Sequence, residues 1–289
     1  MAQDQDLTRV VAPSKGGWDM KHRFGLLLVV ALMAAVAVAA SIGSTGAPAG
    51  TGGKFVVVKP GQKVEIAFAA VPEPPFFGVF STGAQRAIAM AIAMHPTIRG
   101  FPIQVNSVNT LCGDGVDNTG PATAIVANAQ NTAVIGHLCS SGMRSALPIY
   151  EAAGVVTISG SATGDDLPTL GPTVFNRTIV RDGDGGQDWF DDVLALPSVG
   201  LWNQYQGAFP PATATTPFDA FYFDATTLLL DRLQQVSLVV GGNLVIGRTA
   251  LALAVRVTRG FPGVTCTITL NPLTGNRNND AGALTRCAG

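Results

Sequence analysis

The regular alternation of apolar strands and helices between Lys63 and Ser159 limits the fold of this chain more than any other feature. The predicted strands are 63–70, 101–108, 132–139 and 155–159. The predicted helices between them are 81–95, 121–131 and 143–154. Short, continuous apolar strands that are separated by helices form a parallel sheet buried on both faces. The sequence therefore predicts an α/β fold with a doubly wound, mostly parallel sheet and helices on both faces.

The alternation stops near Gly183, and the remaining chain follows a different pattern. Residues 188–217 form a Pro- and Thr-rich connector. Helices are predicted at 218–236, where apolar residues recur at helical spacing, and at 243–257. Residues 264–270 then alternate between apolar residues and threonines, which predicts a C-terminal antiparallel edge strand or hairpin with one solvated face.

The N-terminal part of the chain predicts export. Residues 24–40 carry no charge and follow the sequence Lys-His-Arg at 21–23. This pattern is typical of a secretory signal, and an uncleaved membrane anchor has a similar length. We therefore expect residues 1–40 to be a signal peptide or a membrane anchor of a periplasmic or extracellular protein. Residues 41–62 are expected to be a flexible tether and a lead-in strand.

The chain contains four cysteines, Cys112, Cys139, Cys266 and Cys287. An even number of cysteines in an exported chain indicates two disulfides. The sequence leaves three pairings open. We favour the two neighbouring pairs, Cys112–Cys139 and Cys266–Cys287, because each of them closes a short loop.

Composition and motifs disfavour several classes of function. The net charge of −1 gives no reason to expect a nucleic-acid partner. The chain has no GxSxG elbow and no GxxxxGK[ST] phosphate loop, and no cofactor is expected. His137 and Cys139 share a strand face, but adjacent groups on one face rarely form a catalytic dyad. The aspartates of "GDGVDNTG" and "RDGDGG" lack the EF-hand order, so solvated turns are expected there, and no metal site.

Small hydroxyl residues follow two neighbouring strands, at the point where each strand ends. Ser140 and Ser141 follow strand 132–139, and Ser161, Ala162 and Thr163 follow strand 155–159. Ligands of parallel sheets bind beyond the carboxyl ends of the strands. Free N–H groups and hydroxyls there suit the carboxylate and ammonium of a small amino acid. The alternative is that Ser140 and Thr163 only cap helices.

Several short blocks of this sequence resemble the type I periplasmic binding proteins. The blocks are "FSTGAQRAIAMAI", "VIGHLCSSG", "PIYEAAGVVTISGSAT" and "VFNRTIVRDGDGGQ". They resemble the branch that binds leucine, isoleucine and valine for ABC importers. The resemblance extends from about Ala67 to Gln187, and a weaker one extends from Phe218 to Asn279.

The resemblance implies a role for six residues: Ser140, Ser141, Ser161, Ala162, Thr163 and Asp182. In this family the positions of Ser140 and Thr163 hold the carboxylate of the amino acid, and Thr163 also contacts the ammonium. The position of Ser161 offers its backbone carbonyl to the ammonium. Asp182 matches an aspartate where the chain crosses to the second lobe. Cys112 and Cys139 match the disulfide of the first lobe.

The sequence departs from the family where a second α/β lobe should be. The resemblance implies that residues 63–187 form the first part of one lobe, that 188–217 replace the second lobe, and that 218–289 return to the first. Binding of an amino acid is then expected to be weak, because one lobe leaves it half solvated. The expected partners are the amino acid and an ABC permease in the membrane. The open cleft face is expected to be covered by the connector, by a second copy in a homodimer, or by another protein. The alternative function is an extracellular sensor or assembly module of the same fold.

Overall fold

The computed structural model describes residues 54–72, 77–184, 216 and 218–278. The chain divides into two units, Met1–Pro48 and Ala49–Gly289, and all of the described residues belong to the second unit. The predicted signal or anchor at 24–40, most of the connector at 188–217, and Cys287 lie outside the described residues. Among the described residues, no helix is both long and apolar enough to cross a membrane.

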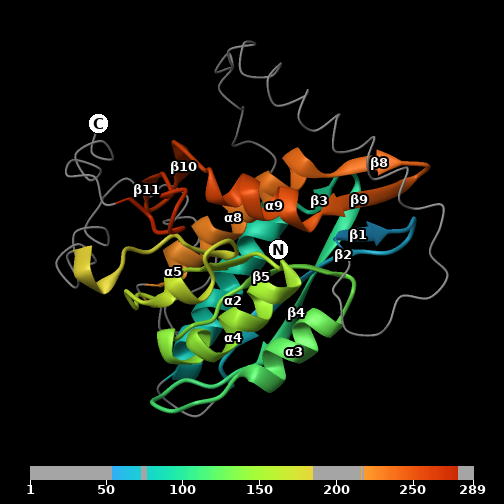
Figure 1. Cartoon of the computed structure of the whole chain (residues 1–289). Helices are drawn as coiled ribbons and strands as arrows, with labels where there is room; N and C mark the ends of the chain where they lie inside the picture. The colour runs from blue at the N-terminus through green and yellow to red at the C-terminus, as the bar shows by residue number, and fades with distance from the viewer. Residues whose placement is uncertain (1–53, 73–76, 185–215, 217, 279–289) are drawn as a thin grey trace, which may run out of the picture. The chain divides into compact units, whose positions relative to one another are not determined.

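The centre of the described part is a six-stranded sheet with the strand order β3-β4-β2-β5-β6-β7. Its strands are β2 (Val64–Ala70), β3 (Thr97–Ile98), β4 (Phe101–Asn109), β5 (Asn131–Ile135), β6 (Thr157–Ser159) and β7 (Phe175–Arg177). Every neighbouring pair is parallel except β3 and β4 (Figure 1). The predicted α/β fold with a mostly parallel sheet is therefore confirmed.

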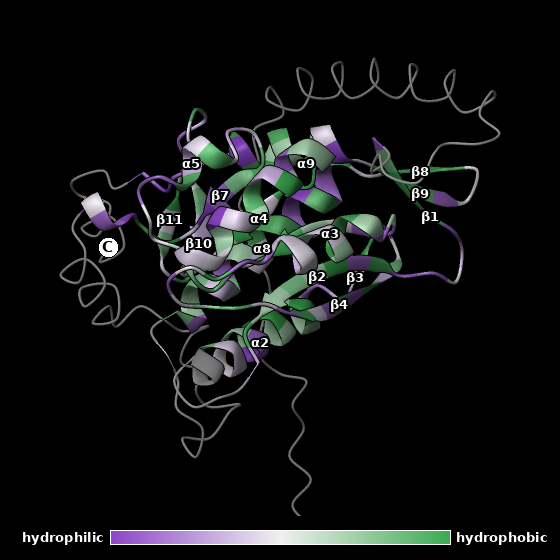
Figure 2. Ribbon diagram, turned by 60° about the horizontal axis from the view of Figure 1, so that its bottom comes forward, coloured by the Kyte–Doolittle hydropathy of each residue, from purple (hydrophilic) through white to green (hydrophobic). Residues whose placement is uncertain are grey.

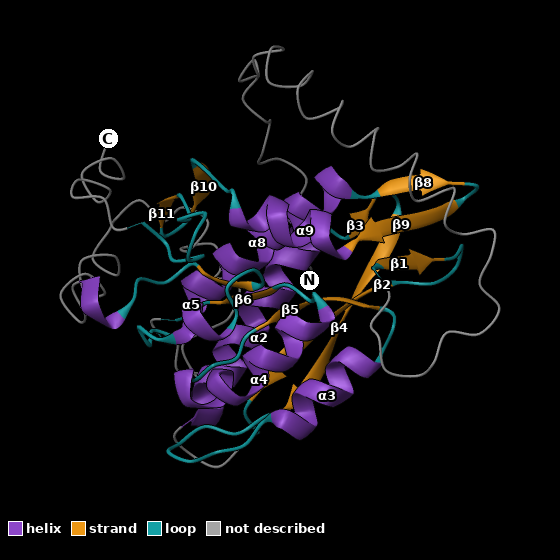
Figure 3. Cartoon of the chain, in the orientation of Figure 1, coloured by secondary structure: helices purple, strands orange, loops and turns teal. Residues whose placement is uncertain are grey.

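Helices cover both faces of this sheet (Figure 3). They are α2 (Phe77–Met94), α3 (Thr119–Ala127), α4 (Ser140–Ala153), α5 (Leu167–Leu170), α8 (Asp219–Val236) and α9 (Arg248–Arg256). Ile66 and Phe68 of β2 pack into a core with α2 and α8. Ala67 and Ala69, on the opposite face, pack against α3 and α4. The alternation of side chains along β2 thus serves two cores, as expected for a strand buried on both faces.

Most of the predicted elements are present with shifted ends. Helix α2 begins at Phe77 rather than at residue 81, and α4 begins at Ser140 rather than at residue 143. Gly154 ends α4 in the left-handed conformation with φ 63°, as the sequence indicates. Figure 2 shows that the hydrophobic residues gather in the central strands and on the helices that pack against them.

The prediction of one helix over residues 243–257 is wrong. Its first part is strand β9 (Asn243–Gly247), and only the rest is helix α9. β9 pairs antiparallel with β1 (Phe55–Val58) and with β8 (Leu238–Val240). β8 and β9 are joined by Gly241 and Gly242, both with positive φ, which is the backbone that a two-residue hairpin turn requires. The expected lead-in strand is β1.

The C-terminal hairpin is confirmed, but one of its faces differs from the prediction. β10 (Phe261–Gly263) pairs antiparallel with β11 (Cys266–Ile268), and Leu270 bridges to Arg277 beyond them. Thr265 was expected on a solvated face and is instead buried. The reason is Asp224 of α8, whose carboxylate accepts hydrogen bonds from the amide and the hydroxyl of Thr265.

The disulfide between Cys112 and Cys139 is present, with 5.5 Å between the Cα atoms. It joins the loop after β4 to the residue that precedes α4. The predicted pairing of Cys266 with Cys287 extends beyond the described residues.

Candidate functional site

The candidate site lies where the parallel strands end at their carboxyl side. β4 lies on one side of β2 and β5 on the other, so the direction of winding changes between β2 and β5. Crevices for ligands open at such a switch point, outside the carboxyl ends of the strands. The loops after β5, β6 and β7 meet at this edge, and all six predicted site residues follow those strands.

Ser140 joins the loop after β5 to the loop after β6. It is the first residue of α4, and its Oγ accepts a hydrogen bond of 2.9 Å from the amide of Gly164. The N-cap of α4 is Cys139, and α5 has Asp166 as its N-cap. The alternative that Ser140 and Thr163 merely cap helices is therefore wrong.

Ser161 and Ala162 are buried and held by backbone and side-chain contacts. Ser161 Oγ donates to the carbonyl of Leu138 at 2.6 Å. Ser159 Oγ accepts from the amides of Ser161 and Ala162 at 3.2 and 3.0 Å. The hydroxyl of Ser161 is thus a structural link between the two loops, and the ligand-facing role implied for this residue concerns its backbone carbonyl.

Polar groups without a protein partner remain at this edge. Within the described residues, no hydrogen bond engages the hydroxyl of Thr163, the carbonyl of Ser161 or the amides of Ser140 and Ser141. The two amides lie in the first turn of α4, where no intrahelical acceptor exists and the helix dipole favours an anion. Thr163 is half-buried. This set combines donors for a carboxylate with acceptors for an ammonium.

Asp182 and Ser141 occupy supporting positions. Asp182 is exposed at the start of the short 3₁₀ helix η1 (Asp182–Asp184), and its amide donates to the carbonyl of Thr163 at 3.0 Å. Its contact with the site thus comes from its backbone. Ser141 Oγ accepts from the amide of Gly113 at 3.2 Å and fixes the loop that carries Cys112.

Two residues that contact the site were missed by the sequence reasoning. Tyr222 of α8 was assigned to the apolar face of a helix, and its ring does pack in the core. Its hydroxyl lies 2.8 Å from Ser161 Oγ and donates to the carbonyl of His137 at 3.3 Å. Gly160 packs so closely on α8 that an added Cβ would lie 2.8 Å from the Tyr222 amide nitrogen.

Arg177, the last residue of β7, is the second missed residue. Its side chain is fully buried, and its Nη1 donates to the carbonyls of Ala162 and Gly164 at 3.0 Å each. Burial lowers the pKa of Arg177 to about 10, so the guanidinium stays charged at neutral pH. The sequence signal was a basic residue in a short stretch that is flanked by apolar residues on both sides, Val174-Phe175 and Ile179-Val180.

His137 and Cys139 cannot form a catalytic dyad in this structure. Cys139 is bonded to Cys112, and His137 is buried with its Nε2 2.9 Å from the hydroxyl of Tyr150. Burial lowers the pKa of His137 to about 3, so this histidine is neutral at physiological pH.

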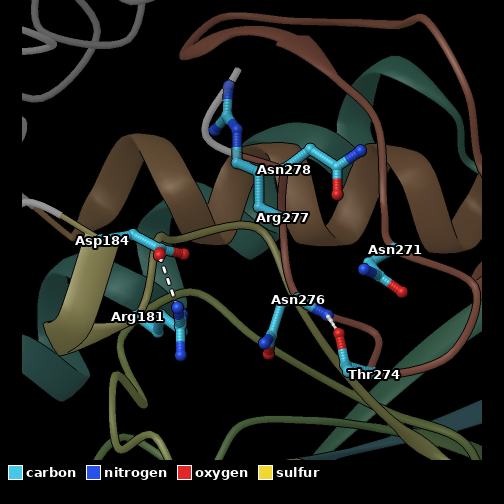
Figure 4. A pocket seen from close by; sticks show the side chains of 7 residues that line it. All are labelled: Arg181, Asp184, Asn271, Thr274, Asn276, Arg277 and Asn278. Carbon is cyan, nitrogen blue, oxygen red and sulfur yellow. Dashed lines mark hydrogen bonds and ion pairs between the residues drawn. The ribbon is translucent and has the colours of Figure 1, made fainter. Parts of the chain in front are cut away.

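A polar pocket of about 420 Å³ lies beside the end of β7 (Figure 4). Its lining residues are Arg181, Asp184, Asn271, Thr274, Asn276, Arg277 and Asn278. Arg181 and Asp184 form an ion pair of 2.8 Å on one side of it. Asn276 connects the pocket to Arg177, whose Nε donates to Asn276 Oδ1 at 3.0 Å. Among the described residues, no group of three or more His, Cys, Asp or Glu side chains could hold a metal ion.

Curated relatives match part of this chain. The Leu/Ile/Val-binding protein of Escherichia coli K12 is 35% identical over 105 residues, which are 36% of this chain and 28% of that protein. The Leu/Ile/Val-binding protein of Citrobacter freundii is 34% identical over the same lengths. The match therefore spans less than a third of the length of these relatives. No protein-family model matches the chain.

Solved structures share the fold over a larger part of the chain. A leucine-binding protein from Thermotoga maritima has a TM-score of 0.58 at 14% identity, covering 74% of this chain and 93% of that one. A substrate-binding protein of a branched-chain amino acid transporter from Streptococcus pneumoniae, in complex with isoleucine, has a TM-score of 0.57 at 12% identity, covering 75% and 94%. A solute-binding protein from R. palustris, in complex with 4-hydroxybenzoate, has a TM-score of 0.58 at 9% identity, covering 75% and 90%.

These relatives are binding proteins of transporters, and none of those named above is an enzyme. The partial sequence match and the shared fold together support membership of the type I periplasmic binding protein family.

Proposed function

We propose that this chain is an exported binding protein for branched-chain or similar amino acids that delivers its ligand to an ABC permease. The observation that carries the proposal is the bond between Ser140 and Gly164, which joins two strand-end loops at the switch point of the sheet. Beside that bond lie groups of Ser140, Ser161 and Thr163 that have no hydrogen-bond partner among the residues that the structure describes. The names of the curated relatives support the choice of ligand.

The chemistry of the edge fits an α-amino acid. The amides at the start of α4 and the Thr163 hydroxyl can donate to a carboxylate, and the helix dipole stabilises its negative charge. The carbonyl of Ser161 can accept from the ammonium. Isoleucine and 4-hydroxybenzoate, the ligands of two structural neighbours, both carry a carboxylate, so this group is the shared element of recognition.

We expect the affinity to be low. The described residues supply one α/β layer, and only residues 185–218 lie between η1 and α8 in the sequence. Closure of two lobes normally buries the ligand of such proteins. Each charge-assisted hydrogen bond that the opposing side does not make is worth about 1.5–3 kcal/mol, so the dissociation constant should be several powers of ten above the nanomolar range. The comparisons do not support a homodimer as the missing side, and it is not part of the proposal.

Calorimetric titration of the mature protein tests the proposal. Leucine, isoleucine and valine should bind, whereas leucinamide, which lacks the carboxylate, should not. 4-Hydroxybenzoate should bind only if the ammonium is dispensable. Thr163→Val should weaken leucine binding by about ten-fold, the equivalent of one hydrogen bond. The matched control is Thr123→Val, since Thr123 is exposed on α3.

The titration has two outcomes that would count against the proposal. One is no response to any of these carboxylates at millimolar concentration. The other is equal leucine affinity in Thr163→Val and Thr123→Val. Either result would favour the alternative of a sensor or assembly module without ligand transport.

A further inference from the structure

The guanidinium of Arg177 holds two carbonyls of the loop that carries Thr163. Its Nη1 contacts the oxygens of Ala162 and Gly164, both at 3.0 Å. The intervening carbonyl of Thr163 is engaged on another side, by the amide of Asp182. One cation thus fixes the orientation of two alternate peptide groups.

The first of these peptide groups contains the amide of Thr163. The carbonyl of Ala162 and the N–H of Thr163 belong to the same peptide unit, so a positive charge on the carbonyl makes the N–H a stronger donor. Within the described residues that N–H has no acceptor. We propose that Arg177 is a positioning residue that orients and polarises the Thr163 peptide toward the carboxylate of the ligand. This inference rests on the proposed function.

Arg177 is also held by residues outside the loop, Gly275 and Asn276. Its Nε donates to Asn276 Oδ1 at 3.0 Å, and its backbone amide donates to the carbonyl of Gly275 at 3.1 Å. Gly275 approaches β7 so closely that an added Cβ would lie 2.0 Å from the carbonyl oxygen of Phe175. The turn that contains Gly275 and Asn276 therefore supports Arg177 through these contacts.

The charge of Arg177 is available to the loop because its direct partners are neutral. Its hydrogen bonds go to two carbonyls and one amide oxygen, and its Nη2 is buried without a partner in the described residues. The nearest acidic groups, Asp165, Asp182 and Asp184, act on it only over longer distances. Burying a cation without a carboxylate against it costs desolvation energy.

Arg256, the last residue of helix α9, provides a matched control whose side chain contacts the same strand. It is also buried, and its Nη2 donates to the carbonyl of Phe175 at 2.6 Å, at the beginning of β7. It therefore resembles Arg177 in burial and in its type of partner, but its bond lies at the opposite end of the strand. Arg177→Gln, Arg177→Lys and Arg256→Gln separate an effect on the loop from an effect on stability.

The first readout needs no ligand. Amide hydrogen exchange over residues 160–166 should become at least about ten-fold faster in Arg177→Gln, since the loop loses charge-assisted bonds to two carbonyls. It should be unchanged in Arg256→Gln and partly restored in Arg177→Lys, which keeps a positive donor. Unchanged exchange in Arg177→Gln would overturn the proposal, whether or not the protein binds leucine.

The second readout is leucine affinity, measured with the folded fraction of each variant confirmed by circular dichroism. Arg177→Gln should bind at least about ten-fold more weakly, and Arg256→Gln should bind as the wild type does even if it melts earlier. Equal losses in both variants would show that burial alone matters and would overturn the proposal. If Arg177→Gln does not fold, Arg177→Lys is tested in its place. A leucine affinity below that of the wild type supports the proposal. Leucine affinity and amide hydrogen exchange equal to those of the wild type overturn it.

If the wild-type protein binds no ligand, the proposed function is refuted, but the result of the hydrogen-exchange experiment on residues 160–166 still stands. In that case, faster amide hydrogen exchange in Arg177→Gln would still show that Arg177 stabilises the loop of residues 160–166.

Discussion

Two polar clusters in this protein differ in how completely their groups are paired. The first, here the strand-end cluster, consists of Ser140, Ser161, Thr163 and Arg177. The second, here the hairpin cluster, consists of Asp224, Thr265 and Arg277. In the hairpin cluster the Asp224 carboxylate accepts from the amides of Val264 and Thr265 and from the Thr265 hydroxyl.

Arg277 completes that cluster by donating to Thr265 Oγ1 at 2.7 Å and to the carbonyl of Thr178 at 2.8 Å. The strand-end cluster, in contrast, retains donors and acceptors that have no partner in the described part of the chain. Paired buried groups hold elements together, whereas groups left open at a crevice indicate a ligand. The difference distinguishes the structural role of the hairpin cluster from the binding role that we propose for the strand-end cluster.

The largest expected effect comes from breaking the hairpin cluster. Asp224→Ala should lower the free energy of unfolding by about 3–5 kcal/mol, because it leaves Arg277 and several donors buried without the carboxylate. Leucine affinity of the folded fraction should not change. Chemical denaturation measures the first and calorimetry the second, with Asp231→Ala, a half-exposed position on α8, as the control. If Asp224→Ala lost as much leucine affinity as Thr163→Val, the hairpin cluster would not be purely structural, and the proposed difference between the two clusters would be wrong.

Opening the disulfide should affect both stability and the strand-end cluster. The bond joins residues 27 apart, for which loop-closure entropy gives about 3.6 kcal/mol. Because Cys139 directly precedes Ser140, the Cys112→Ser/Cys139→Ser protein should also bind leucine more weakly. Thermal melting and calorimetry of this double variant test both effects. Weaker binding without lower stability, or the reverse, would show that the bond serves only one of the two roles.

The third prediction concerns pH and His137, which lies beneath the strand-end cluster. Burial lowers its pKa to about 3 in the folded state, against about 6.5 when unfolded, so the unfolded chain binds the extra proton between these values. Stability should therefore fall as the pH drops from about 6.5 toward 3, by up to about 1.4 kcal/mol per pH unit from this group.

His137→Gln removes the titrating group and leaves a polar partner for Tyr150. The difference in free energy of unfolding between wild type and His137→Gln should thus depend on pH in this window. A constant difference from pH 7 to pH 4 would contradict the assignment.

The smallest expected effect is that of Tyr222→Phe. It removes the hydroxyl that contacts Ser161 and His137, a loss of about 1 kcal/mol in stability. It should also loosen the Ser161 loop and weaken leucine binding by a few-fold at most. Tyr150→Phe is the control, since it removes a hydroxyl that contacts His137 alone among the described residues. Equal binding in both variants would show that α8 does not support the loop.

Much of the strand-end cluster could be predicted from the sequence, and the reason is local. Ser140, Ser161 and Thr163 follow apolar strands directly, so the position of each strand fixes the position of its loop. Whether these residues bind a ligand remains a prediction. Arg177 and Tyr222 were missed because their contacts with the loop depend on tertiary packing: one lies in a strand of three residues and the other on a helix far along the chain.

The C-terminal part of the fold was predicted less well. The pattern "VVGGNLVIG" contains the signal of a hairpin, since two glycines separate two β-branched apolar stretches. It was overlooked because "LVIG" also continues into the helical spacing of α9. The burial of Thr265 had no local signal at all, because its partner Asp224 lies 41 residues away.

Helix α8 carries Tyr222 and Asp224 two residues apart, and so it serves both clusters at once. Since α8 follows η1 in the sequence, a nascent polypeptide that has been synthesised only to η1 lacks the Tyr222 partner of Ser161 and one wall of the larger core. Such an intermediate cannot complete this core until α8 has emerged. If the chain is exported as proposed, completion of this core has to wait until α8 has been translocated.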